Sequence, residues 1–413
     1  MVQGQQVYVA GVGVISAIGH DTGETLRALQ QGISGIGPLT LFPSLYQDVL
    51  PVGEVSLSNE ALTERLNLRS RSHTRWLSGH AVSRTALLGM AAARQAVDHA
   101  GIDLAAWRCG LISATTVGGM DRTENFFPAF LENPAAGHLR DVVHHACGDI
   151  TELMAEDLQI SNFISTINTA CSSSVNAIMY GARLLAQGML DVVVAGGADA
   201  LTKFTLNGFN SLKILDTAPC RPFDAHRNGL NLGEGAGYVV LVGERVRQQL
   251  QGPMLATVAG FGNTNDAYHQ TASSPEGRGS YAAMTEALSM AGLSVEAIDY
   301  INLHGTGTVN NDLSESTAIQ RLFGEHVPAV SSTKAFTGHT LGASGGIEAV
   351  FSVLALTGQC IFPNLRFEQA MPETGITPQR TFAPAAVRHV MSNSFGFGGN
   401  CSSIIFSISP DHP

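Results

Sequence analysis

One arrangement occurs twice in this chain of 413 residues: an apolar strand, a reactive side chain, and an apolar helix that a glycine ends. In the first copy, residues 163–167 alternate as a strand does, Cys171 follows, and apolar residues recur at helical spacing as far as Gly188. In the second copy, a strand at 329–332 precedes His339 and another helical pattern. Alternating strands and helices predict an α/β fold with mainly parallel sheets. The copies match in pattern rather than in identity, which indicates an internal duplication.

The duplication predicts two tightly joined halves within one large folded unit. We expect residues 1–252 to form the half with the reactive cysteine and residues 253–413 to form the half with the reactive histidines. A polar, charged stretch at 244–251 separates them. With 44% hydrophobic content, a chain of this length can bury a large core.

Cys171 lies where the first strand turns into its helix, among small residues that leave room for a substrate. A helix that begins here directs its unsatisfied N–H groups and the positive end of its dipole at the sulfur. That setting favours the thiolate. A thiolate suits thioester substrates in particular, because the covalent intermediate is again a thioester. The alternative, a buried structural cysteine, is the commoner case for cysteines in general.

Two histidines lie on short loops rich in small residues, each after a predicted strand. His304 follows the strand 300–303 in the sequence His-Gly-Thr-Gly-Thr, and His339 lies five residues after Lys334. Together with Cys171 they form a nucleophile with two hydrogen-bond partners. A packed or surface position is the alternative for either histidine alone. Metal binding is less favoured, because neither has a carboxylate or a second histidine at helix-ligand spacing.

The charge of the chain argues against two classes of partner. With 23 basic and 34 acidic residues, the net charge of −11 gives no general attraction to nucleic acid or to an anionic membrane. One basic cluster stands out against this background, and it comprises Arg65, Arg69, Arg71 and Arg75. It is either a solvated helix face or a docking patch for an acidic partner.

Cysteine spacing and the N-terminal sequence indicate the compartment. The six cysteines show no metal-ligand pairing, and the first six residues lack the basic start of a signal peptide. No apolar run approaches the roughly 18 to 20 residues that span a bilayer. We therefore expect a soluble protein in a reducing cytoplasm.

The sequence Gly11-Val12-Gly13 near the N-terminus has the look of a dinucleotide-binding loop. The third glycine of that motif is missing, and no acidic residue follows at the right interval. We expect these glycines to serve a tight, buried turn instead.

Five motifs, taken together, resemble the β-ketoacyl-acyl carrier protein synthases of the elongating kind, the condensing enzymes of fatty acid and type II polyketide synthesis. They occur in the family's order, and the resemblance runs from about Val7 to Ile408. The motifs are NTACSSS at 168–174, RPFDAHRNGLNLGEGAG at 221–237, HGTGT at 304–308, KAFTGHTLGASG at 334–345 and NSFGFGG at 393–399.

The resemblance implies the thiolase fold, with two similar βαβ-rich halves in α-β-α-β-α layers, usually as a dimer. It implies that Cys171 accepts an acyl chain from an acyl carrier protein, and that His304 and His339 activate malonyl-carrier protein for decarboxylation. Imidazole N–H donors in a dry site stabilise the negative charge that decarboxylation places on the malonyl thioester oxygen. Backbone N–H groups of Cys171 and Phe397 would hold the oxyanion of the acyl carbonyl.

The same resemblance assigns supporting roles. Lys334, with Glu315 as its charge partner, would orient the site and tune His339. Phe397 would also gate the acyl entrance. Thr306, Thr308 and Thr271 are candidates to bind the pantetheine arm, and Arg65, Arg69 and Arg71 to dock the acidic carrier, with Arg75 as a weaker candidate. No enzyme-bound cofactor is expected, because the 4′-phosphopantetheine belongs to the carrier protein.

The chain departs from the family pattern at three places. Val309 stands where proline is common, Asn400-Cys401 replaces Thr-Asn, and the Leu230–Gly233 segment is similar to synthases of aryl polyene clusters, which work with a chain-length-factor partner. A non-catalytic partner subunit is one alternative, but such subunits typically lack the cysteine. A thiolase acting on coenzyme A substrates is another. Homodimer and heterodimer both remain open, and so does chain length, which would depend on residues such as Ile112, Phe204 and Phe209.

Overall fold

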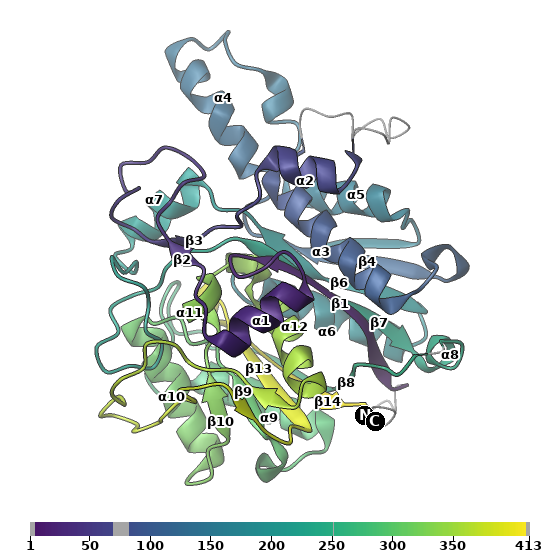
Figure 1. Cartoon of the computed structure of the whole chain (residues 1–413), viewed down its shortest axis with the longest axis vertical. Helices are drawn as coiled ribbons and strands as arrows, with labels where there is room; N and C mark the ends of the chain where they lie inside the picture. The colour runs from purple at the N-terminus through teal and green to yellow at the C-terminus, as the bar shows by residue number, and fades with distance from the viewer. Residues whose placement is uncertain (1–4, 69–81, 251, 410–413) are drawn as a thin grey trace.

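The structure is a computed structural model that describes residues 5–68, 82–250 and 252–409. A ten-stranded sheet forms its centre (Figure 1). The strands of this sheet are β1 (Val7–Ser16), β4 (Cys109–Ala114), β5 (Phe163–Ile167), β6 (Val192–Asp199), β7 (Gly235–Gly243), β8 (Ala256–Asn265), β9 (Tyr300–Asn302), β10 (Ala329–Ser331), β13 (His389–Phe395) and β14 (Asn400–Ile408). Two small antiparallel pairs lie outside it, β2 (Ile36–Gly37) with β3 (Val52–Gly53) and β11 (Cys360–Ile361) with β12 (Ala383–Pro384).

Helices precede or follow nearly every strand. They are α1 (Thr22–Gln31), α2 (Asn59–Arg65), α3 (Arg84–Ala100), α4 (Met120–Glu132), α5 (Cys147–Leu158), α6 (Ser173–Ala186), α7 (Lys203–Ser211), α8 (Glu244–Arg247), α9 (Arg278–Ala291), α10 (Val309–Phe323), α11 (Lys334–Thr337) and α12 (Ser344–Thr357). Among the described residues, no helix is long and apolar enough to cross a membrane.

The order of the strands is the same when read inward from either edge of the sheet. One half runs β5-β4-β6-β7-β1 and the other runs β10-β9-β13-β14-β8. The directions agree as well, because the pairs β4·β5, β4·β6, β9·β10 and β9·β13 are parallel while β6·β7, β1·β7, β13·β14 and β8·β14 are antiparallel. Only two residue pairs, Tyr8 with Thr257 and Val9 with Ala256, join β1 to β8. This shared topology supports the duplication, and a boundary after residue 252 stays a prediction.

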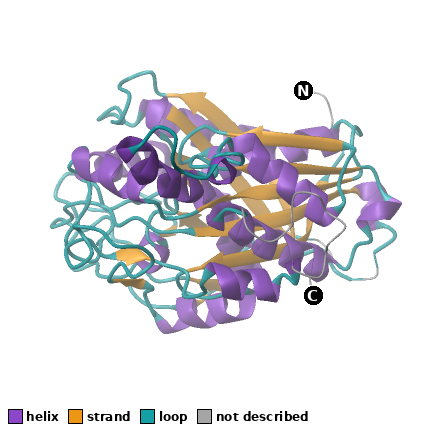
Figure 2. Ribbon diagram, turned by 90° about the horizontal axis from the view of Figure 1, so that it is seen from above, coloured by secondary structure: helices purple, strands orange, loops and turns teal. Residues whose placement is uncertain are grey.

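The helices form three layers around the two halves of the sheet (Figures 1 and 2). Helices α3 and α5 pack on strands of the first half, and α9 packs on β8 and β14 of the second half with α10 against it. Helices α6 and α12 touch strands of both halves and each other, so they form the central layer. Every residue of α12 from Ser344 to Leu356 is buried, as this position requires. The arrangement is the thiolase fold with its α-β-α-β-α layers, which confirms the predicted fold class.

The two early glycines are not in a turn, contrary to the expectation from the sequence. Gly11 and Gly13 lie inside β1, and the backbone of α3 crosses directly above them. A Cβ at Gly11 would be 2.2 Å from the Ala96 carbonyl oxygen, and one at Gly13 would be 2.1 Å from that of Ala92. The glycines therefore permit close packing of a helix on a strand.

Helix α4 projects from the body of the molecule, at the top of Figure 1. It carries large apolar side chains that water reaches, since Phe127 is 52% and Leu131 is 72% exposed. An exposed apolar surface of this kind is typical of a protein contact or a ligand groove.

Candidate active site

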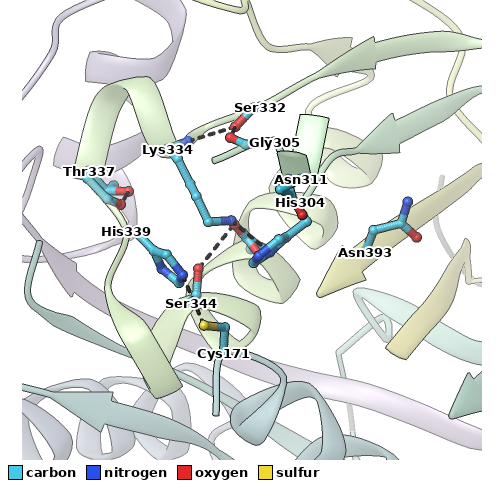
Figure 3. Close-up of polar contacts among 12 residues, drawn as sticks. Cys171, His304, Gly305, Asn311, Ser332, Lys334, Thr337, His339, Ser344 and Asn393 are labelled. Atoms are coloured by element: carbon cyan, nitrogen blue, oxygen red, sulfur yellow. Dashed lines mark hydrogen bonds and ion pairs between the residues drawn. The ribbon is translucent and has the colours of Figure 1, made fainter. Parts of the chain in front are cut away.

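Three strand ends bring the predicted reactive residues together. Cys171 follows β5, His304 follows β9 and His339 follows β10, and Figure 3 shows their side chains converging. Because β5 and β10 occupy equivalent places in the two halves, Cys171 and His339 lie at matching positions of the duplicated plan. The site therefore lies between the halves, with the thiol from one and both imidazoles from the other.

The hydrogen bonds of His339 determine which of its nitrogens carries the proton. Its Nδ1 accepts the backbone N–H of Leu341 at 3.2 Å, and its Nε2 lies 3.1 Å from the Cys171 sulfur. Burial, and next the charge of Lys334, hold the pKa of His339 well below 6.5. The imidazole is therefore neutral, and its single proton on Nε2 points at the thiol.

His304 is fixed in the same tautomer by a different partner. Its Nδ1 lies 3.3 Å from Nζ of Lys334, which as an ammonium group can only donate. Burial, Lys334 and His339 together keep the pKa of His304 well below 6.5. The two rings meet edge to face with centroids 5.5 Å apart. Both imidazoles are thus neutral and carry their proton on Nε2.

The charge partner of Lys334 is Glu348 of α12, not Glu315 as the resemblance implied. Nζ of Lys334 forms a buried ion pair with Glu348 Oε1. Glu315 instead accepts the backbone N–H groups of His304 at 2.9 Å and Gly305 at 2.8 Å, and burial raises its pKa to about 7. Since its oxygens are used by this loop, Glu315 fixes the main chain of His304 rather than the lysine.

The resting state of Cys171 also differs from the expectation. Burial raises the pKa of its thiol to about 11, although Lys334 and the backbone N–H groups of Phe397 and Cys171 lower it. Desolvation therefore outweighs Lys334 and these two N–H groups, and the free residue is a thiol rather than the expected thiolate. The two N–H groups that face the sulfur are those proposed for the oxyanion.

A cavity of about 270 Å³ leads from the surface to Cys171, His304 and His339. Thr271, Thr306 and Thr308, which the resemblance suggests for the pantetheine arm, line it. The hydroxyls of Thr306 and Thr308 are 2.9 Å apart. Phe397 also lines this cavity and stacks on Phe209 at 5.8 Å.

A second, mainly apolar cavity of about 220 Å³ adjoins Cys171 on the other side of this aromatic pair. Phe209 and Phe397 line both cavities. Met120 and Phe204 line the second cavity and also a larger apolar groove of about 850 Å³ beneath α4. The sequence pointed to Phe204 and Phe209 but missed Met120, whereas Ile112 of β4 lies instead in the central core, which contains residues of both halves.

Of the predicted carrier-docking patch, the structure describes Arg65. Arg65 is exposed in the last turn of α2, and its Nη2 lies 3.4 Å from the His20 carbonyl oxygen. Arg69, Arg71 and Arg75 lie outside the described residues.

A buried thiol beside two neutral imidazoles, between the halves of a duplicated α/β fold, defines a thiolase-fold acyltransferase. Family profiles described as "Beta-ketoacyl synthase, N-terminal domain" and "Beta-ketoacyl synthase, C-terminal domain" match residues 4–247 and 255–368. The chain belongs to the beta-ketoacyl synthase family.

Similar proteins extend over almost the whole chain. A 3-oxoacyl-[acyl-carrier-protein] synthase 2 of Coxiella burnetii is 34% identical over 98% of both chains, and one of Staphylococcus aureus is 32% identical over 98% of this chain and 99% of that one. Among solved structures, "the ishigamide ketosynthase/chain length factor" has a TM-score of 0.88 at 30% identity, covering 98% of this chain and 99% of that one. The ketosynthase ApeO in complex with its chain length factor ApeC, from Xenorhabdus doucetiae, has a TM-score of 0.83 at 32% identity over 98% of both chains.

Proposed function

We propose that this protein is a β-ketoacyl-acyl carrier protein synthase that loads an acyl chain onto Cys171 and extends it with malonyl-acyl carrier protein. The observation that carries the proposal is the set of N–H groups around one thiol. The backbone N–H groups of Cys171 and Phe397 face its sulfur, Nε2–H of His339 lies 3.1 Å away, and His304 lines the same cavity. Two groups of donors suit a reaction that forms two oxyanions in succession.

Acyl transfer is the first step. The sulfur of Cys171 attacks the thioester carbonyl of the acyl-carrier protein, and the N–H groups of Cys171 and Phe397 stabilise the oxyanion that forms. The bond between the carbonyl carbon and the carrier sulfur then breaks, and the departing carrier takes the proton that Cys171 gives up. One thioester replaces another, so the exchange needs no other reactant.

Condensation is the second step. Malonyl-carrier protein loses carbon dioxide, and its electron pair passes into the thioester enolate, whose oxygen accepts the Nε2–H groups of His304 and His339. The enolate carbon attacks the acyl carbonyl on Cys171, the carbon–sulfur bond breaks, and the released thiolate takes a proton from water. Lys334 acts through His304 by keeping Nδ1 an acceptor, and Glu315 fixes the His304 backbone.

Two kinds of partner follow from this proposal. An acyl carrier protein would dock at the surface that includes Arg65, Arg69 and Arg71 and insert its phosphopantetheine arm past Thr271, Thr306 and Thr308. A second subunit would cover the exposed apolar side of α4. Either a copy of this chain or a chain-length-factor-like subunit could fill that place, and similarity to two ketosynthase/chain length factor structures supports the second option.

The free thiol state of all six cysteines supports a cytoplasmic location.

The acyl chain would lie in the apolar cavity next to Cys171 and continue into the groove beneath α4. Phe397, stacked on Phe209, stands between this cavity and the carrier entrance. Gly398 and Gly399 have φ of 82° and 83°, in the left-handed region that favours glycine, so they permit the sharp turn of this loop. Movement of the loop would open the path for the chain, which is the gating role proposed for Phe397.

Met120 is expected to limit chain length, because it lines both the cavity and the groove. Met120→Trp should lower the loading of dodecanoyl chains by about tenfold or more while butyryl chains load as before, since a larger side chain blocks the continuation. Loading is measured by intact-protein mass spectrometry after timed mixing with each acyl-carrier protein. Met290→Trp, an exposed change on α9, is the matched control. Equal losses for both chain lengths would contradict this role of Met120.

The test of the function is intact-protein mass after mixing the enzyme with carrier proteins that bear saturated, polyenoyl or aryl acyl chains, followed by malonyl-carrier protein. We expect an acyl adduct that is absent in Cys171→Ala, and then a product longer by one two-carbon unit. The preferred chain separates fatty acid synthesis from polyketide or aryl polyene synthesis. The same experiment with an added chain-length-factor subunit tests whether the enzyme depends on that partner. An enzyme that takes up no acyl chain in either setting is not a condensing enzyme.

A further inference from the structure

Asn400 is the first residue of β14, directly after the glycine-rich loop that carries Phe397. Its side-chain oxygen Oδ1 is 2.7 Å from the Ser172 hydroxyl and 2.9 Å from the Asn176 amide nitrogen. The amide of Asn263, on β8, approaches the same oxygen at 3.1 Å. Donors from the start of α6 and from β8 thus converge on one half-buried atom.

Ser172 links this network to the turn that holds the nucleophile. It is fully buried and follows Cys171 in the chain. On the other side of Cys171, Ala170 has φ of 55°, a left-handed conformation that is unfavourable for a residue with a Cβ. Such a conformation persists only where the surrounding bonds over-determine it. The Ser172 hydroxyl, which shares its single proton between Asn400 Oδ1 and the Thr169 carbonyl oxygen at 2.7 Å each, is one of the groups that hold this turn.

The main chain of Asn400 holds the opposite side of the site. Its carbonyl oxygen accepts the Gly396 N–H at 2.8 Å, which closes the loop 396–399 at its base. A Cβ at Gly396 would lie 2.7 Å from the Thr169 carbonyl oxygen and 3.2 Å from the Cys171 nitrogen. The base of the loop is therefore already in contact with the nucleophile turn, and the next residue supplies the Phe397 N–H.

We infer that Asn400 is a positioning residue for the two backbone N–H groups that stabilise the oxyanion of acyl transfer. Its side chain bonds the turn that supplies the Cys171 N–H, and its backbone bonds the loop that supplies the Phe397 N–H. This inference rests on the proposed function. Oxyanion donors act only at hydrogen-bond distance from the developing charge. A small displacement of the Cys171 or Phe397 N–H group therefore lowers the rate of acyl transfer.

The two imidazoles depend on other residues. His339 is oriented by Leu341 and His304 by Lys334 and Glu315. A change at Asn400 should therefore affect acyl transfer while leaving decarboxylation intact. A residue with a merely structural role would lower both together.

The experiment compares Asn400→Leu, which removes the accepting oxygen at nearly constant shape, with Asn400→Asp, which keeps one. We expect Asn400→Leu to slow acylation of Cys171 by about tenfold to a hundredfold, as displacement of an oxyanion donor should. Asn400→Asp should restore most of that rate. Release of carbon dioxide from malonyl-carrier protein, measured in the Cys171→Ala background, should be the same with and without Asn400→Leu. Asn263→Leu, which leaves the bond between Ser172 and Asn400, is the matched control.

Several outcomes would overturn the inference while the proposed function stands. These are normal acylation of Asn400→Leu, equal losses of acylation and decarboxylation, or an Asn263→Leu variant as slow as Asn400→Leu. Asn400→Ala replaces the leucine variant if that protein does not fold. Failure of the wild-type enzyme to accept an acyl chain would instead reject the proposed function, so the two failures are distinguishable.

Discussion

His304→Ala and His339→Ala are each expected to lower the decarboxylation of malonyl-carrier protein by about 10²- to 10³-fold, the effect of removing one oxyanion donor. Each imidazole is neutral and presents Nε2–H towards the site, because Leu341 and Lys334 occupy the two Nδ1 atoms. Acylation of Cys171 should fall much less, because backbone groups stabilise that oxyanion. The two steps are measured separately, as release of carbon dioxide and as mass of the acyl-enzyme.

His339→Gln is the informative companion, since a side-chain amide still offers an N–H donor. It should retain more decarboxylation than His339→Ala. Equal losses in the two variants, or loss of acylation without loss of decarboxylation, would contradict the assignment of the imidazoles as donors.

The pH dependence provides a second check on the same groups. Because the pKa values of His304 and His339 are well below 6.5, the rate of decarboxylation should not fall as pH decreases from neutrality through 6.5. Stability behaves differently. In the unfolded chain both histidines take up protons near 6.5, so their contribution to the free energy of unfolding is present above that pH and is lost progressively below it. Because burial raises the pKa of Glu315, which holds the His304 backbone, to about 7, the check is made in Glu315→Gln; a rate that still falls there with a midpoint near 6.5 would contradict neutral, buried imidazoles.

Lys334→Ala is expected to lower the free energy of unfolding by about 3–5 kcal/mol, because it leaves the carboxylate of Glu348 buried without its partner. It should also slow decarboxylation, because Nδ1 of His304 loses the donor that fixes its tautomer. Chemical denaturation measures the first effect and release of carbon dioxide the second.

A double variant separates these two effects. Lys334→Met with Glu348→Gln removes both charges, so most of the stability should return while decarboxylation stays slow. Recovery of both properties would show that the ion pair matters only for folding. A single Lys334→Ala variant of unchanged stability would contradict the buried pair itself.

Much of the site was predictable because its signals are local. Strand Phe163–Ile167 has the predicted bounds, and the helix after Cys171 ends at Ala186, two residues before the predicted stop Gly188, which has φ of 68°. The matching places of Cys171 and His339 also follow from the repeated order of strand, loop and helix. The fold class could therefore be predicted from the sequence.

The partner of Lys334 was not predicted, because an ion pair depends on how two helices pack. A signal was nevertheless present. Glu348 is the single charged residue of an otherwise apolar helix, residues 344–357, and a charge in such a helix must be paired. Glu315 looked equally suitable in the sequence, but its oxygens bond the backbone of His304 and Gly305.

The protonation state of Cys171 and the positioning role inferred for Asn400 could not be predicted from the sequence either. A helix terminus can be predicted from residues 168–188, but the degree of desolvation depends on every segment that covers the thiol. The loop 396–399 comes from the far end of the chain, and its contact with Thr169 exists only in the folded protein. The prediction of a turn at Gly11 and Gly13 was wrong for the same reason, because helix α3, which packs on these glycines, is distant in sequence.

Two glycines at the start of α12 allow this helix to pack closely against the start of α6 and against β7. A Cβ at Gly345 would lie 3.0 Å from that of Val175, and one at Gly346 would lie 2.5 Å from the Gly237 carbonyl oxygen. The Gly346 N–H also donates to the Ser174 hydroxyl at 2.7 Å. These contacts hold the start of α12 against the start of α6, and they thereby fix the spacing of Cys171 and His339. Under the proposed function, substitutions of the α4 and α7 side chains that line the apolar cavity would change which acyl chains bind without changing that spacing.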